Sequence, residues 1–426
     1  MNKKILFVTL PFPGCVHPNL SVALALVRRG HDVAFFTGKA LCPRITAAGP
    51  ACFPYPEQLE AMYHRLVASP TDGVGATWSH RTQLRASLRA FFSDVLPLQY
   101  QGLADVLRQW PADLIVCDPA IWAPFLVLTH THHIPVVILS YLLGNSLIGP
   151  NTPQMGMGLK PANNLWQRAY NRLATQIMEW YMTEVRRPAN EFRQQFDLPP
   201  VKGPIIRLGE KLPLFLVTSC PELDFGRQDF PGNTHYVGSL MWYPPHPPAA
   251  WLSELPRDLP WVHATEGTIH YHESTVLKAT AEALANQPAT VILTTGGNRE
   301  PHEAGLTGLA ENVKVVRWIN HDELLPKIDL LVCTGGSGVM LAALYPGVPI
   351  IAVPTEWDHA DNTERMAYTG AGISLQPKQC QPPRLRELIF EVLADPSYRE
   401  NARRVGRSLR QMGGPDRAAA LIEGVL

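Results

Sequence analysis

The sequence has no excess of charge of either sign. Its 426 residues include 37 lysines and arginines against 37 aspartates and glutamates, so the formal net charge at pH 7 is 0. A protein that binds nucleic acid without sequence preference needs a surplus of cationic side chains to neutralise phosphates. The balance of charge, with no nucleic-acid-binding motif in the chain, predicts that nucleic acid is not a partner.

Long apolar runs are also missing. Asp118 and Pro124 interrupt the longest candidate for a membrane span, which would need roughly 20 apolar residues. Pro11 and Pro13 end the apolar run after Lys4 before it reaches the length of a signal-peptide core. We therefore expect no transmembrane segment and a cytoplasmic location, and peripheral contact with a membrane through an exposed patch stays open.

The seven cysteines lack the CxxC spacing of redox and zinc motifs. Cys117 and Cys333 lie inside apolar runs, which predicts that most cysteines are small buried hydrophobes in a reducing compartment. The histidines at 130, 132 and 133 have no cysteine or carboxylate partner at ligand spacing. They predict a surface turn, and we expect no metal site.

What the sequence does contain is a glycine-rich turn between two apolar runs. Residues 329–333 predict a buried strand, 334–338 (TGGSG) a turn, 339–344 a short helix and 350–353 a second strand. Amides at a helix N-terminus favour a phosphate, and glycines let the backbone approach it closely. The turn is neither a Walker loop nor a complete GxGxxG motif, so plain packing remains an alternative.

The rest of the chain predicts two α/β units, as its length also suggests. Residues 5–9 predict a strand, Pro18 falls in the first turn of a helix that Gly30 ends, and 31–37 predict the next strand. Residues 214–217 predict the last strand of this half. Residues 241–248 form a proline-rich spacer, after which the strand–helix pattern restarts at 260–265.

The segment around 334–362 resembles the donor-sugar motif of family-one nucleotide-sugar glycosyltransferases of the bacterial natural-product type. Gly347-Val348-Pro349, Pro354, Asp358 and Asn362 match that motif in register. Two positions depart from it. Thr334 stands where many members have a phosphate-binding histidine, and His359 replaces a sugar-binding glutamine.

This resemblance implies the GT-B fold, an α/β architecture with two Rossmann-like domains facing across a cleft. The expected boundaries are an acceptor-binding domain at 1–240, a linker at 241–256, a nucleotide-sugar-binding domain at 257–400 and a crossing C-terminal helix at 401–426. The helix at 398–426 would return to the first domain.

The resemblance also assigns residues to the nucleotide sugar. Trp318 would stack on the base, with ordinary burial of a tryptophan as its rival, and Asp358 and His359 would hold sugar hydroxyls. The full set of expected donor-binding positions is Thr268, Trp318, His321, Thr334, Gly336, Ser337, Gly338, Val339, Asp358 and His359.

Two positions compete for the role of catalytic base, because Cys15 stands where the family's base is found and His17 follows two residues later. Asp118 would hold a histidine base by a hydrogen bond, or it is simply a helix cap. His17 as base, Cys15 as a thiolate base and no base at all are the alternatives. The first predicts that His17→Ala lowers turnover by about a hundredfold or more.

The function implied is inverting transfer of a sugar, expected to be glucose, from a UDP-sugar to a hydroxyl of a small, apolar or aromatic acceptor. Phe12, Trp78 and Tyr141 are the expected acceptor contacts. No cofactor is expected beyond the sugar nucleotide as co-substrate, activity should persist in a chelator, and the protein should be a monomer or homodimer. The sequence does not decide whether the nucleotide of the donor is UDP or dTDP. It also leaves two other functions open: a nucleotide-sugar epimerase or hydrolase, and a nucleotide-sugar-binding protein without catalytic activity.

Overall fold

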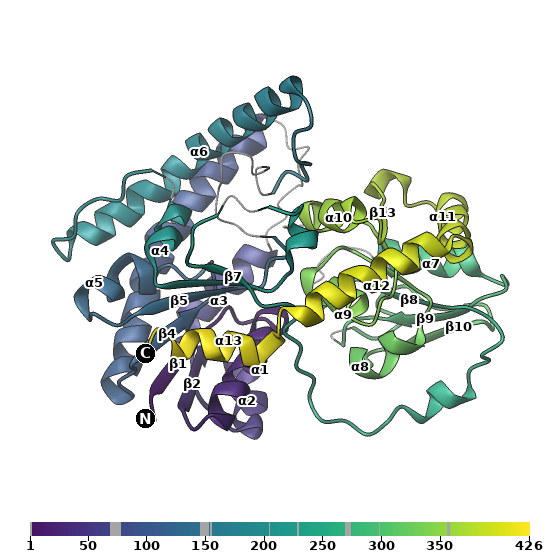
Figure 1. The fold of residues 1–426 in the computed structure, drawn as a ribbon, viewed down its shortest axis with the longest axis horizontal. Coiled ribbons are helices and arrows are strands. Elements are labelled where there is room, and N and C mark those ends of the chain that lie inside the picture. The colour runs from purple at the N-terminus through teal and green to yellow at the C-terminus, as the bar shows by residue number, and fades with distance from the viewer. Residues whose placement is uncertain are drawn as a thin grey trace.

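Two parallel β-sheets, each flanked by helices, form the two halves of the protein (Figure 1). A computed structural model describes residues 2–68, 78–144, 153, 156–203, 205–227, 230–268, 274–297, 299–355 and 358–426. Within these ranges every strand pairing is parallel, as expected for alternating strands and helices.

The first sheet has the order β3-β2-β1-β4-β5-β6-β7. Its strands are β1 (Lys4–Val8), β2 (Asp32–Thr37), β3 (Ala51–Pro54), β4 (Leu114–Cys117), β5 (Val136–Ser140), β6 (Leu214–Val217) and β7 (Thr234–Tyr236). The prediction that 214–217 is the last strand is wrong. β7 adds one more, and its Thr-His-Tyr sequence has no apolar run to announce it.

The helices of this half are α1 (Pro13–Arg28), α2 (Cys42–Ala48), α3 (Glu57–Ala68), α4 (Trp78–Gln109), α5 (Thr129–Thr131) and α6 (Leu165–Gln194). Helix α1 begins five residues earlier than the position of Pro18 predicts. Phe12 is its extended N-cap and Pro13 its first residue, where a missing amide hydrogen costs nothing. Cys15 and His17 therefore both lie inside the first turns of the helix.

The second sheet has the order β10-β9-β8-β11-β12-β13. Its strands are β8 (Trp261–Thr265), β9 (Thr290–Thr294), β10 (Val313–Val316), β11 (Leu330–Cys333), β12 (Ile350–Ala352) and β13 (Gly372–Ser374). Its helices are α7 (Thr275–Leu284), α8 (His321–Leu324), α9 (Ser337–Leu344), α10 (His359–Tyr368), α11 (Pro382–Ala394) and α12 (Pro396–Gln411). The predicted strand–turn–helix–strand at 329–353 is present as β11, α9 and β12, with α9 beginning at Ser337 instead of 339.

The C-terminal helix returns to the first half of the chain (Figure 1). The sequence predicts one helix over 398–426, but Gly413 adopts a φ of 87° and divides it into α12 and α13 (Gly414–Glu423). Helix α13 packs on α1, where Ala418 and Ile422 join the apolar core of the first half. Arg29 also donates to Glu423 at 2.7 Å across this contact.

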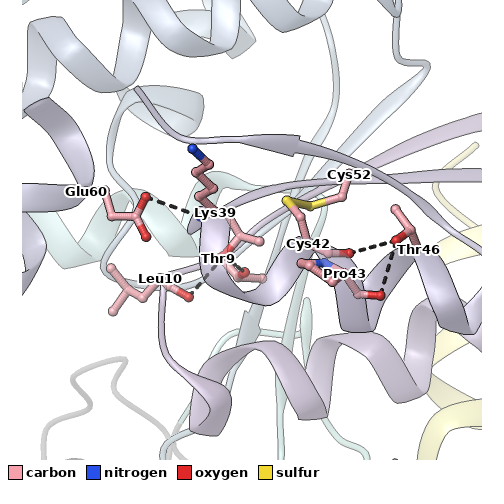
Figure 2. Close-up of a disulfide and its surroundings, with 9 residues drawn as sticks. Thr9, Leu10, Lys39, Cys42, Pro43, Thr46, Cys52 and Glu60 are labelled. Carbon is pink, nitrogen blue, oxygen red and sulfur yellow. Dashed lines mark hydrogen bonds between the residues drawn. A yellow bond between two sulfur atoms is a disulfide. The ribbon is translucent and has the colours of Figure 1, made fainter. Parts of the chain in front are cut away.

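One pair of cysteines departs from the expectation of buried free thiols. Cys42 at the start of α2 forms a disulfide with Cys52 in β3 (Figure 2). The other five cysteines are free and buried, as predicted for Cys117 and Cys333. The pairing could not be read from spacing alone, because a ten-residue separation becomes a contact only after α2 folds back against β3.

Candidate functional site

The carboxyl ends of the two central strands carry the residues that the sequence singles out. Asp118 directly follows β4 in the first half, and Thr334 directly follows β11 in the second. Ligands of open α/β sheets bind at this edge of the strands. The site is therefore built from two clusters, one on each half.

Asp118 is the centre of the cluster on the first half and has no exposed surface. Its carboxylate accepts hydrogen bonds from the backbone amide of Leu10 at 2.7 Å and from Asn19 Nδ2 at 3.0 Å. Burial raises the pKa of Asp118 well above its usual range, and these two hydrogen bonds oppose that rise. The expected hydrogen bond from His17 to Asp118 is not formed, and Asp118 accepts hydrogen bonds from Leu10 and Asn19 instead.

Cys15 lies beside Asp118, on the same face of α1 as Asn19, whose Nδ2 also donates to the Cys15 carbonyl at 2.8 Å. Burial, and secondarily the Asp118 charge, raises the pKa of Cys15 well above its usual value. Tyr141 lies close enough to the Cys15 thiol to lower the pKa of Cys15 by a smaller amount. The net rise is opposite to the lowering that a thiolate base at a helix N-terminus requires.

His17 points away from this cluster. Its ring packs edge-on against Trp242, with centroids 5.1 Å apart. Burial, and then the Arg44 charge, lowers the pKa of His17 to about 4. The physical reason is helical geometry: residues two apart in a helix lie about 200° apart around its axis. Once α1 begins at Pro13, Cys15 and His17 must face opposite sides.

The cluster on the second half surrounds the start of α9. Gly336 is the N-cap, and the first helical hydrogen bond runs from the Met340 amide to the Gly336 carbonyl at 3.2 Å. The amides of Ser337, Gly338 and Val339 therefore have no partner within the helix. Such amides form an anion site together with the helix dipole.

Helix α10 brings polar side chains to the same turn. Asn362 Nδ2 donates to the Gly335 carbonyl and to Asp358 Oδ2, both at 2.9 Å. The His359 ring lies near Gly336, with Nε2 3.8 Å from the position of a Cβ there. Its Nδ1 lies 3.2 Å from Thr355 Oγ1. The predicted pair Asp358 and His359 thus lies beside the predicted phosphate site.

Two further hydrogen bonds, made by Thr334 and Glu266, hold the loop beside this turn in place. Thr334 is buried and its hydroxyl donates to the Glu266 carbonyl at 3.3 Å, so it braces the loop that carries Thr268. The Glu266 carboxylate accepts from the Val276 amide at 2.9 Å and caps α7. Sequence reasoning missed Glu266, because only the fold places it under the start of that helix.

Trp318 is 42% exposed and lies at the rim of the second half. Its Nε1 donates to Asn320 Oδ1 at 3.0 Å, and its ring stacks on His321 with centroids 6.3 Å apart. Burial, and next the neighbouring His263, lowers the pKa of His321 to about 3, so the ring is neutral. An exposed indole face above a neutral ring can stack on a nucleobase.

The two clusters are close enough to interact electrostatically. Asp358 of the second half contributes to the raised pKa values of Cys15 and Tyr141 of the first half. The structure therefore brings together the predicted residues Cys15, Tyr141, Asp118 and Asp358, and it separates His17 from them.

The expected acceptor contacts have different outcomes. Tyr141 lies in the Asp118 cluster, as described above. Phe12 is buried and packs edge-on against His64, with centroids 5.6 Å apart. Trp78 begins α4, but its side chain lies outside the described residues.

Among the described residues, no helix is long and apolar enough to cross a membrane. The same residues contain no group of three or more His, Cys, Asp or Glu side chains arranged to hold a metal ion. His130, His132 and His133 are exposed, as predicted for a surface turn.

Comparison with known proteins agrees with this geometry. Residues 278–420 match the family model described as Erythromycin biosynthesis protein CIII-like, C-terminal domain. The whole chain is 29% identical to 4'-demethylrebeccamycin synthase of Lentzea aerocolonigenes, covering 100% of both chains. It is 26% identical to zeaxanthin glucosyltransferase of Pseudescherichia vulneris, over 95% of this chain and 93% of that protein.

Solved structures share the whole fold. Spinosyn rhamnosyltransferase in complex with thymidine diphosphate superimposes with a TM-score of 0.73 at 19% identity, covering 99% of each chain. The same enzyme is also known with spinosyn aglycone. The predicted GT-B fold is thereby confirmed, as is the resemblance to glycosyltransferases of bacterial natural-product pathways.

Proposed function

We propose that this chain, a homologue of bacterial natural-product glycosyltransferases, transfers a sugar from a nucleoside diphosphate sugar to a hydroxyl of a small, largely apolar acceptor. One observation carries the proposal. The open N-terminus of α9, beside Asp358 and His359, lies near a cluster of Cys15, Asp118 and the partly buried Tyr141 on the other half. Sugar transfer requires groups that bind the diphosphate of the donor and groups that take up the proton of the acceptor hydroxyl. We assign the first to the second half of the chain and the second to the first half.

The donor would occupy the second half. The amides of Ser337 to Val339 would bind the diphosphate, with Thr268 at its edge, and Asp358 and His359 would bind sugar hydroxyls. Trp318 would stack on the base, beside His321. Glucose is our first candidate and a deoxyhexose the second, since the similar proteins named above include a glucosyltransferase and a rhamnosyltransferase. UDP and dTDP are both compatible with these contacts.

The reaction would be a single displacement. The acceptor oxygen bonds to the anomeric carbon as the bond from that carbon to the diphosphate oxygen breaks, which inverts the configuration. Developing charge on the leaving diphosphate would be stabilised by the helix amides, which are preorganised and need no proton transfer. We expect no divalent cation and no resident cofactor to be required.

The proton of the acceptor hydroxyl would be taken up by the cluster on the first half. Asp118 is the best candidate to hold this proton at the end of the step. Its pKa is raised, which brings it closer to the pKa that an efficient base has at neutral pH. Cys15 and Tyr141 would lie between Asp118 and the acceptor. His17 is disfavoured, since it faces Trp242 instead of this cluster.

A second candidate function is a nucleotide-sugar-binding protein that transfers nothing. The Cys15 thiol, with its raised pKa, in place of the family's base favours this alternative. An epimerase or hydrolase of the same fold would act on the donor without any acceptor.

Three single variants test the proposal: Asp118→Asn, His17→Ala and Cys15→Ala, compared by turnover on a phenolic and an aliphatic acceptor. We expect Asp118→Asn to lose about a hundredfold or more on the aliphatic alcohol, and less on the acidic phenol that needs little help. His17→Ala should lose less than about tenfold. The readout is product mass under saturating donor.

The outcome separates all the candidates. Equal loss in His17→Ala would return the base to His17 and overturn the role of Asp118. Binding of sugar nucleotide with no transfer to any acceptor would support the silent binding protein. Free sugar or an epimerised donor without acceptor would identify a hydrolase or an epimerase.

A further inference from the structure

Helix α6 carries a row of exposed apolar side chains that the proposed reaction does not use. We call this row the α6 ridge, and it consists of Trp166, Tyr170, Leu173, Ile177 and Trp180. Trp166 is 87% exposed and Trp180 is 49% exposed. Spacings of four, three, four and three residues place all five on one face of the helix, over a length of about 21 Å.

The ridge is not the face that holds the helix on the protein. Ala174 and Val185 are the buried residues of α6 in this region, and they lie to one side of the ridge. Figure 1 shows α6 running beside α4 along the outside of the first half. A contiguous apolar surface that is exposed to water, as this one is, marks a site where a protein binds another molecule or a membrane.

We infer that the α6 ridge docks on the surface of a lipid bilayer that carries anionic head groups. Tryptophan and tyrosine are the side chains that settle at the boundary between head groups and acyl chains. Three of the five ridge residues are of these types. An amphipathic helix that lies in this boundary combines such a face with exposed basic residues.

Charge favours a lipid surface that carries anionic head groups. Arg168 and Arg172 are exposed, and residues 165–178 contain no aspartate or glutamate; Glu179 is the first acidic residue of the helix. Each arginine follows a ridge aromatic by two residues, so both project from the polar side of the helix, where interfacial helices carry their basic residues. Anionic head groups attract both arginines.

The ridge helix is also connected to the rim of the candidate site. Asn171 of α6 donates to the Lys160 carbonyl at 3.1 Å, and Lys160 pairs with Glu364 of α10 at 3.2 Å. The Gly158 amide donates to Asp361, also on α10, at 2.8 Å. A bilayer held by the ridge would therefore lie near the helix that begins with His359, where an apolar acceptor could pass from lipid to site.

Flotation with lipid vesicles tests the inference without any substrate. The full-length protein is mixed with vesicles of equimolar phosphatidylcholine and phosphatidylglycerol, or of phosphatidylcholine alone. We expect it to float with the anionic vesicles, to float much less with the neutral ones, and to dissociate as salt is raised.

Two pairs of variants locate the contact. Trp166→Gln with Leu173→Gln should weaken binding by about tenfold or more, while Val27→Gln with Tyr368→Gln, at exposed apolar positions on α1 and α10, should not. Arg168→Gln with Arg172→Gln should weaken binding to anionic vesicles, while Arg384→Gln with Arg407→Gln should not.

Three results would overturn the inference. They are no flotation of the unaltered protein, unchanged flotation of the ridge variant, and a mass in solution that falls from dimer to monomer in the ridge variant. Transfer to a water-soluble acceptor should be unchanged in the ridge variant. A failure of the proposed enzymatic function would therefore leave the vesicle result interpretable, and the reverse also holds.

Discussion

At the scale of single residues, Cys15 and His17 show how two positions in one turn acquire different environments. Cys15 faces Asp118 and Tyr141, whereas His17 is pressed against Trp242. Cys15 is buried and His17 is partly buried, and burial acts on them in opposite directions. It raises the pKa of the thiol, which must lose a proton to become charged, and lowers the pKa of the imidazole, which must gain one.

The partly buried His17 predicts a loss of stability in acid. Its pKa is about 4 in the folded protein and 6.5 when unperturbed, so between these values the unfolded chain binds more protons. The contribution of His17 to the free energy of unfolding is fully present above pH 6.5. It should be lost as the pH falls toward 4, and the loss should be no more than about 2–3 kcal/mol. Urea unfolding at several pH values would measure it.

His17→Gln should flatten this dependence, because glutamine cannot take up the proton. His263 and His321 have lowered pKa values for the same reason and should keep part of the acid sensitivity. His302→Gln, at an exposed histidine, is the matched control and should unfold like the unaltered protein. Parallel curves for His17→Gln and the unaltered protein would refute the burial argument.

At the scale of one element, α9 depends on the conformation of the turn before it. Gly335 has a φ of 95°, a backbone angle that residues with a side chain rarely adopt. A Cβ there would lie 2.7 Å from Thr363 Cγ2 and 3.2 Å from the His359 carbonyl. Only glycine at this position therefore lets the turn before α9 pass this close to α10.

Gly335→Ala should lower the free energy of unfolding by about 1–3 kcal/mol and weaken binding of a sugar nucleotide. Gly338 supplies the control within the same helix, since a Cβ there meets nothing within 4 Å. Gly338→Ala should raise stability by up to about 1 kcal/mol, because alanine suits a helix better. Thermal unfolding without ligand separates the two, and equal effects would contradict the steric account.

At the scale of the whole molecule, a buried ion pair ties the two halves together. Arg365 on α10 lies 3.2 Å from Asp224, which follows β6 in the first half. The arginine is 5% exposed and the aspartate 0%, and the guanidinium also lies over the Phe225 ring at 4.6 Å. The same helix begins at the donor-side pair Asp358 and His359, so the contact sets where that pair sits.

Arg365→Ala should destabilise the protein by about 1–3 kcal/mol, because buried Asp224 loses this charged partner while Arg227 and the Tyr236 hydroxyl remain. It should also broaden unfolding into separate transitions of the two halves. Arg384 pairs with Glu387 at 2.9 Å on an exposed helix, and Arg384→Ala should change stability by less than about 0.5 kcal/mol. If both variants melt together with the unaltered protein, the ion pair is not a structural link.

Local signals in the chain were sufficient for much of this architecture. The apolar runs at β1, β4, β6 and β11 announce buried parallel strands, which need apolar side chains on both faces. Edge strands β3 and β7 lack such runs and were missed. The disulfide between Cys42 and Cys52 was missed too, because it depends on how α2 returns to β3.

The sequence by itself determined the two-sheet fold and the place of the donor turn, because burial patterns and glycine positions act locally. Only the tertiary structure decided which side chains share a site. Helix α1 begins at Pro13, five residues before the predicted position, and its turns place His17 away from the site and Cys15 beside Asp118. This arrangement depends on packing between segments about a hundred residues apart, which no local pattern encodes.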